Sequence, residues 1–147
     1  MPSSLPPLAE LAPGLSAAGA LGPAAIDALA ASGVRTIINN RPDDEDPGQL
    51  PADEARRLAE AQGIAYHHIP VTAASLSRAD VEAFAAVLRS AEQPVVAHCR
   101  SGTRSTLLWA LTQLDEGADP AALIAAAARH GIDIAALPAF AARLSQG

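Results

Sequence analysis

The sequence contains no lysine, so all ten of its basic residues are arginine. This absence excludes enzymes that depend on a lysine: those with a Walker A phosphate loop, those that form a Schiff base, and acyl transferases with a Ser-x-x-Lys motif. Aromatic residues make up only 3% of the chain, and the formal net charge is −6. Proteins that bind nucleic acids present basic patches and stacking rings, so we expect no nucleic-acid partner.

Cys99 is the sole cysteine, which excludes an intramolecular disulfide and every Cys-x-x-Cys metal or redox motif. Long apolar runs are also missing, because glycine, proline and aspartate interrupt the stretch from residue 15 to residue 31. The first residues lack the basic start and apolar core of a secretory signal. These features predict a cytoplasmic protein that has no membrane partner, and we expect neither a metal nor another cofactor.

Half of the 147 residues are apolar, which predicts a single domain over residues 1–147 with a loosely ordered lead at residues 1–10. Apolar runs predict buried strands at 34–38, 64–71 and 94–98, and the ambiguous segment 11–21 has room for a short strand. Helices are predicted at 23–31, 52–62, 81–91, 104–114, 120–130 and 134–144. Strands that alternate with helices are typical of an α/β domain with a largely parallel sheet.

The segment HCRSGTRS, residues 98–105, joins the last predicted strand to a predicted helix. Ligands of parallel sheets bind at the carboxyl ends of the strands, so this junction is the first place to expect a site. Cys99 would face the positive end of the helix and a turn of backbone amides, both of which stabilise a thiolate. Gly102 permits the bend that lets the amides converge, and Arg104 adds a positive charge.

The predicted roles in this segment follow from the residue types. Catalytic roles fall to Cys99 as the nucleophile, Arg104 as the anion-binding group and Ser105 as a hydrogen-bond donor to the sulfur. The anion-binding loop is predicted to consist of Arg100, Ser101, Gly102 and Thr103, with His98, Asn40 and Arg41 as supporting residues and Arg41 and Arg100 also steering anions. The alternatives are an inert buried thiol at Cys99 and an ordinary surface turn at Asn40 and Arg41.

Several segments together resemble the phosphatase-like domain of the beta-lactamase-hydrolase-like family. They are NNRPD at residues 39–43, HIPV at 68–71, HCRSGTRS at 98–105 and LLWAL at 107–111. The resemblance extends from about residue 15 to residue 144, and the combination is specific although no single piece is. It implies the three-layer fold of the cysteine phosphatases, in which helices flank a central, mainly parallel sheet of four or five strands. Some members of that family resemble phosphatases and others resemble sulfurtransferases.

Two features of the sequence bear on the choice between these reactions. Phosphatases of the tyrosine and dual-specificity type place five residues between cysteine and arginine, whereas this chain has four, as rhodanese-type sulfurtransferases do. Cleavage of a phosphoester also needs an acid that protonates the leaving group. Residues 71–74, where dual-specificity phosphatases carry that aspartate, contain no acid. The remaining candidates are Asp43, Asp44, Glu45 and Asp46, although a solvated acidic turn is the simpler interpretation of this run.

We therefore expect a sulfurtransferase that moves sulfane sulfur through a persulfide on Cys99. Its expected partners are an anionic donor, such as thiosulfate or glutathione persulfide, and a thiol acceptor. The alternative is a cysteine-dependent phosphatase of the tyrosine or dual-specificity type with a phosphocysteine intermediate on Cys99. A third hypothesis is a non-enzymatic redox sensor in which the thiolate is simply oxidised.

Overall fold

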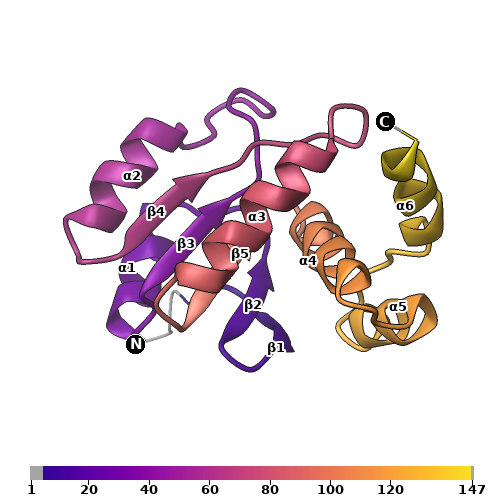
Figure 1. Ribbon diagram of the computed structural model, residues 1–147. Helices are drawn as coiled ribbons and strands as arrows, with labels where there is room; N and C mark the ends of the chain where they lie inside the picture. Colours follow the sequence, from indigo (N-terminus) through magenta and orange to yellow (C-terminus); the bar gives the residue numbers. More distant parts are fainter. Residues whose placement is uncertain (1–4, 147) are drawn as a thin grey trace.

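The computed structural model describes residues 5–146, which form an α/β domain with one sheet between layers of helices (Figure 1). The strands, in their order across the sheet, are β1 (Ala9–Ala12), β2 (Leu15–Ala18), β5 (Val95–His98), β3 (Thr36–Asn39) and β4 (Ala65–His68). The edge strand β1 is antiparallel to β2, and the other neighbours are parallel. The expected mainly parallel sheet is confirmed, and β5 lies at its centre.

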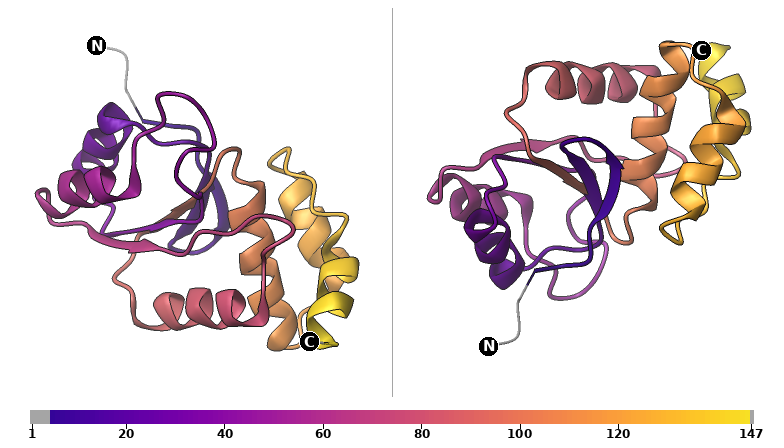
Figure 2. Two further views of the ribbon diagram at one scale, coloured as in Figure 1. Left: turned by 90° about the horizontal axis from the view of Figure 1, so that it is seen from above. Right: turned by 90° about the horizontal axis from the view of Figure 1, so that it is seen from below.

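The helices lie on both faces of the sheet (Figure 2). They are α1 (Pro23–Ala31), α2 (Ala52–Glu60), α3 (Arg78–Ser90), α4 (Thr103–Asp115), α5 (Pro120–Ala128) and α6 (Leu137–Ser145). Helices α1 and α2 pack together on one face, and α3 and α4 pack together on the other. Helices α5 and α6 contact the outer side of α4, so α4 is enclosed between the sheet and this pair.

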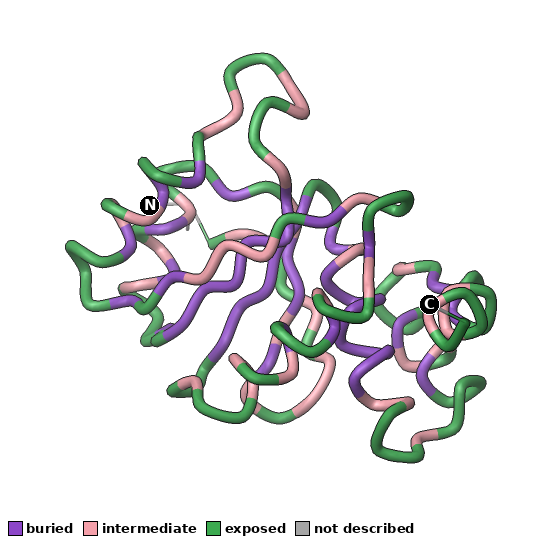
Figure 3. Tube along the Cα trace, turned by 45° about the horizontal axis from the view of Figure 1, so that its top comes forward, coloured by how far each residue is buried: buried purple, intermediate pink, exposed green. Residues whose placement is uncertain are grey.

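Strand β3 shows why the central strands β3 and β5 are buried along their whole length. Successive side chains of a strand point to opposite faces, and here both faces are covered. Ile37 packs with Ile26 and Leu29 of α1, whereas Ile38 packs with Phe84 of α3 and Leu108 of α4. The centre of the sheet is accordingly buried on both sides (Figure 3). A run of buried residues of this kind fixes the carboxyl ends of the strands in place.

The observed elements differ from the predicted ones mainly near the N-terminus. The expected loose lead at residues 1–10 is wrong in part, because Ala9 and Glu10 belong to β1 and pair with Ala17 and Ser16. Residues 1–4 lie outside the described part of the chain. Strand β4 ends at His68 rather than at residue 71, since Pro70 has no N–H to donate to a neighbouring strand.

Helix α3 begins with a capping box, which predicts a measurable contribution to stability. The Ser77 hydroxyl accepts a hydrogen bond from the Asp80 N–H at 3.3 Å, and the Asp80 carboxylate accepts one from the Ser77 N–H at 2.9 Å. We expect Ser77→Ala to lower the free energy of unfolding by about 1 kcal/mol in a urea titration. Ser90→Ala, at the other end of α3, is the control, and an equal loss in both variants would contradict the prediction.

Candidate active site

The segment after β5, residues 99–104, is called the Cys99 loop below, and the ends of both neighbouring strands hold it. The Cys99 N–H donates to the Ala18 carbonyl of β2 at 3.3 Å. On the other side, the Asn40 N–H donates to the His98 carbonyl at 2.7 Å. Cys99 itself is fully buried. The loop therefore begins at the centre of the carboxyl edge of the sheet.

Gly102 turns the Cys99 loop back toward its own start. Its φ angle of +92° lies in the left-handed region, which favours glycine, and a Cβ atom there would lie 3.5 Å from the Ala18 carbonyl oxygen. The Gly102 N–H donates to the Cys99 Sγ at 3.1 Å. Gly102 is also the N-cap of α4, so the sulfur lies at the positive end of that helix.

Arg104 is held by one edge of its guanidinium group. Nη1 donates to Glu45 at 2.7 Å and to the Val71 carbonyl at 2.9 Å, and Nη2 donates to Glu45 at 2.8 Å. The hydrogen bonds to Glu45 raise the pKa of Arg104, burial opposes this, and the nearby charge of Cys99 adds to the rise. A guanidinium carries five N–H donors, so the Nε hydrogen and one Nη2 hydrogen remain for Cys99 and for an anion beside it.

Glu45 reaches Arg104 from the loop between β3 and α2. The hydrogen bond from Arg104 lowers the pKa of Glu45 against the opposing effect of burial, and a hydrogen bond from Arg41 adds to the lowering. Glu45 is therefore ionised at neutral pH and serves as an acceptor that positions Arg104. The sequence leaves Glu45 either as a candidate acid that reaches the site or as part of a solvated turn; the solvated turn is wrong for Glu45, which reaches Arg104 as an ionised acceptor rather than as a proton donor.

The solvated turn expected for most of this run is confirmed for Asp43 and Asp44, which are exposed, but not for Asp46. Asp46 pairs with Arg41 and with Arg100, whose Nε lies 3.0 Å from its carboxylate. The Asp43 carboxylate accepts the Ala52 N–H at the start of α2, at 2.9 Å. Asp44 is exposed, with a φ angle of +65°. Of these three residues, only Asp46 contacts the Cys99 loop, which Glu45 also reaches through Arg104.

The predicted anion-steering arginines carry ion pairs in this structure. Arg41 is buried, and its guanidinium pairs with Glu45 and Asp46. The prediction that Arg41 steers incoming anions is therefore wrong, because its guanidinium is buried and already paired. Arg100 keeps 64% of its side chain exposed while it pairs with Asp46, so it remains accessible to a charged ligand.

Ser105 does not lie where its predicted catalytic role requires. Its hydroxyl is buried and donates to the Asn40 Oδ1 at 2.7 Å, so it is not the expected donor to the sulfur. The Asn40 amide donates in turn to the Ile69 carbonyl at 3.0 Å. These bonds tie the first turn of α4 to the ends of β3 and β4. Ser105 and Asn40 thus support the loop from the side. This is the role predicted for Asn40 but not the one predicted for Ser105.

The remaining residues of the segment differ in exposure. His98 is buried behind the loop, and desolvation lowers its pKa to about 4 against a hydrogen bond with the Cys99 backbone. Its Nδ1 has no hydrogen-bond partner within residues 5–146. At the front, the Ser101 hydroxyl donates to the Thr103 hydroxyl at 3.2 Å and is exposed. Because its pKa is about 4, His98 is neutral at pH 7.

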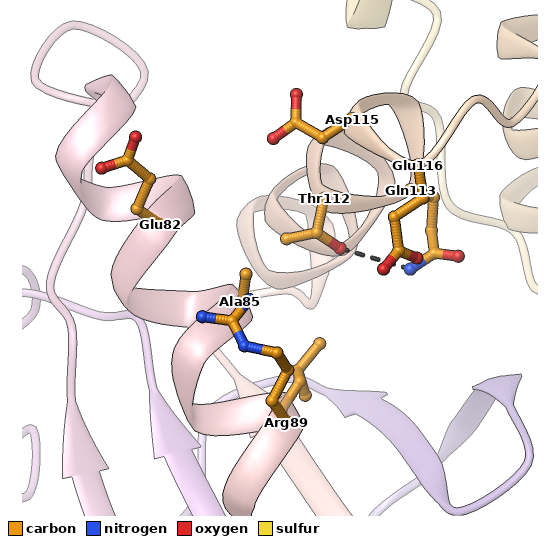
Figure 4. Close-up of a pocket in the computed structure, with 8 residues that line it drawn as sticks. Glu82, Ala85, Arg89, Thr112, Gln113, Asp115 and Glu116 are labelled. Carbon is orange, nitrogen blue, oxygen red and sulfur yellow. Dashed lines mark hydrogen bonds between the residues drawn. The ribbon is translucent and has the colours of Figure 1, made fainter.

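Other parts of the described chain offer less chemistry. Within residues 5–146, no group of three or more histidine, cysteine or acidic side chains is placed to hold a metal ion. Nor is any helix in that range long and apolar enough to cross a membrane. A groove of about 340 Å³ between α3 and α4 is lined by Glu82, Asp115 and Glu116 together with Arg89 (Figure 4). It lies at the far end of α4 from the Cys99 loop, and its excess of carboxylates does not suit an anion.

Sequence comparison agrees with this architecture. The profile of the family described as "Beta-lactamase hydrolase-like protein, phosphatase-like domain" matches residues 8–117. The chain belongs to this family. A relative, the beta-lactamase hydrolase-like protein of Xylella fastidiosa, is 40% identical over 89 residues, which cover 60% of this chain. The match covers 21% of that relative, so the aligned residues span about a fifth of the longer protein.

Solved structures extend the similarity to the complete fold of the phosphatase-like domain. A protein of Neisseria meningitidis, provisionally named a phosphatase, superposes with a TM-score of 0.80 and 35% identity over 93% of this chain and 95% of its own. The kinase-associated phosphatase, which has a catalytic-site cysteine, superposes with a TM-score of 0.73 over 100% of this chain and 98% of its own. At 17% identity, that second similarity shows the fold alone. The family profile and the Neisseria protein support a phosphatase-like enzyme and give no support to the expected sulfur transfer.

Proposed function

We propose that this phosphatase-like domain is a cysteine-dependent phosphatase in which Cys99 is the nucleophile and Arg104 binds the phosphoryl group. The observation that carries the proposal is the guanidinium of Arg104, which Glu45 and Val71 hold by one edge while the other remains available beside Cys99. A fork of two N–H donors matches two oxygens of a phosphoryl group. The similarity to phosphatases supports the same reaction.

The reaction would proceed in two steps. The Cys99 thiolate attacks phosphorus, an S–P bond forms, and the ester P–O bond breaks with its electron pair on the leaving oxygen. Water then attacks phosphorus, the S–P bond breaks, and inorganic phosphate is released with the thiolate restored. The Arg104 fork and the amides of the Cys99 loop stabilise the negative charge on the phosphoryl oxygens in both steps.

The acidic residues of the site restrict the substrate. Arg104 keeps Glu45 ionised. Asp46 forms ion pairs with Arg41 and Arg100. Neither carboxylate is therefore arranged as a proton donor. A leaving group that departs without a proton must be stable as an anion. The proposed substrates are therefore phosphate esters of acidic alcohols such as phenols, rather than esters of simple alkyl alcohols.

A second candidate function is sulfane-sulfur transfer, which two observations favour. Only four residues separate Cys99 from Arg104, and sulfite or thiolate leaving groups need no proton. In that reaction the Cys99 thiolate attacks the outer sulfur of thiosulfate, a new S–S bond forms, and the donor S–S bond breaks to release sulfite. An external thiolate then takes the outer sulfur and restores the Cys99 thiolate.

A mass measurement distinguishes the two reactions. With 4-nitrophenyl phosphate and rapid acid quench, we expect Cys99 to gain the mass of one phosphoryl group while nitrophenolate is released, because the covalent intermediate precedes hydrolysis. Cys99→Ser is the matched control and should show neither change. A gain of one sulfur atom from thiosulfate, without turnover of the phosphate ester, would replace the phosphatase proposal with sulfur transfer. Failure of both reagents to modify Cys99 would contradict both.

A further inference from the structure

A cavity of about 360 Å³ lies beside the Cys99 loop, between the N-terminal hairpin and the turn after α5. It is called the hairpin cavity below. It is lined by Pro7, Leu8, Ala9, Ala17, Ala18, Gly19, Ser101, Gly102, His130, Gly131 and Ile132. Because β1 is antiparallel to β2, the residues before Ala9 reach the carboxyl end of β2. The cavity therefore lies at the same edge of the sheet as Cys99.

The hairpin cavity shares a wall with the Cys99 loop. Ser101 and Gly102 line it, and the Gly102 N–H donates to the Cys99 Sγ at 3.1 Å. Gly19 packs against this wall, since a Cβ atom on it would lie 3.3 Å from the Arg100 carbonyl oxygen. Ser101 is exposed and lines the cavity, so a ligand whose anion lies in the Cys99 loop would enter the cavity by extending past Ser101.

The lining of the hairpin cavity suits an uncharged group. Leu8 and Ile132 supply apolar side chains, and the residues from Ala17 to Gly19 are too small to fill the space. Among residues 5–146, no carboxylate or arginine lines it, and His130 is the one titratable residue there. Pockets for organic ligands combine such apolar walls with a few polar groups, which here are the Ser101 hydroxyl and the His130 ring.

We propose that the hairpin cavity binds the uncharged organic group of the substrate while the anion of the same molecule lies in the Cys99 loop. This inference rests on the proposed function of the Cys99 loop and names its substrate class: small esters with an aryl or similarly apolar group. A bare inorganic anion would leave the cavity unused. Apolar contacts of this kind are worth about tenfold or more in discrimination between ligands.

Calorimetric titration of the 147-residue chain with a non-hydrolysable pair of ligands tests the proposal. Phenylphosphonate carries an aryl group on phosphorus, and inorganic phosphate lacks it. We expect phenylphosphonate to bind about tenfold tighter than phosphate. Leu8→Trp fills the cavity and should abolish that preference without changing the affinity for phosphate. Leu5→Trp is the matched control, since Leu5 is a similarly exposed leucine of the same segment that does not line the cavity.

Ile132→Trp repeats the test from the opposite wall and covers the case in which Leu8→Trp fails to fold. Equal binding of the two ligands by the unaltered chain would overturn the proposal, as would a preference that survives filling from both walls. A cavity-dependent preference without a phosphoryl adduct on Cys99 would support the cavity and contradict the phosphatase. An adduct without any preference for phenylphosphonate would overturn the cavity alone.

Discussion

Replacement of Arg104 by lysine is expected to lower kcat/KM for an aryl phosphate by about 10²- to 10³-fold, the effect of losing one preorganised donor in a transition state. Lysine keeps the positive charge but offers a single ammonium group in place of a planar fork. It also cannot donate simultaneously to Glu45, to the Val71 carbonyl and to a phosphoryl oxygen in the present geometry. Steady-state kinetics with 4-nitrophenyl phosphate measures this change.

Two further variants complete the Arg104 prediction. One is a control at an exposed arginine, and the other alters what positions Arg104 while Arg104 keeps its charge. Arg35→Lys alters an exposed arginine that pairs with Glu92, and it should leave kcat/KM unchanged. Glu45→Gln removes the charge that holds the Arg104 guanidinium but keeps one acceptor, so a smaller loss of about tenfold is expected, mainly in kcat. A loss below about threefold in Arg104→Lys would show that Arg104 does not contact the reacting group.

The buried strands and most helices could be predicted from the sequence because local patterns determine them. Helix α1 has its predicted bounds, since Pro23 suits a first turn and Gly33 follows the helix. The run from Ser77 to Asp80 predicts the capping box that is observed, but helix α3 begins at Arg78, directly after the N-cap Ser77 and three residues earlier than predicted. Strand β1 could not be predicted, since its sequence AELA has a low β-propensity and owes its conformation to pairing with β2.

Only the residues of the candidate site that are neighbours in sequence could be predicted. Cys99, Gly102 and Arg104 are neighbours in sequence, and their chemistry follows from a strand-to-helix turn. Glu45 is 59 residues from Arg104, and its contact depends on the path of the loop after β3. An acidic run directly after a strand that ends at the same sheet edge was the available signal. Sequence alone leaves this run either as a solvated turn or as a source of a candidate acid, because it does not show which carboxylates meet an arginine.

The buried His98 predicts a loss of stability in mild acid. Its folded-state pKa of about 4 lies below the value near 6.5 of an unfolded chain, so the unfolded state binds more protons between these values. The resulting stabilisation is fully present above pH 6.5 and is lost as the pH falls through about 4. The difference corresponds to about 3 kcal/mol in the free energy of unfolding. Urea titrations at pH 7, 5.5 and 4.5 measure most of this loss.

A variant that cannot titrate isolates the contribution of His98 from that of the carboxylates. His98→Gln should be less stable at pH 7 but should lose about 3 kcal/mol less than the unaltered chain as the pH falls. His130→Gln, at an exposed position, should follow the unaltered chain. Parallel losses in all three proteins would contradict the prediction. A charged His98 would lie near Arg41 and His68 as well as in an apolar setting, so its protonation would disturb the same strand ends that hold the Cys99 loop.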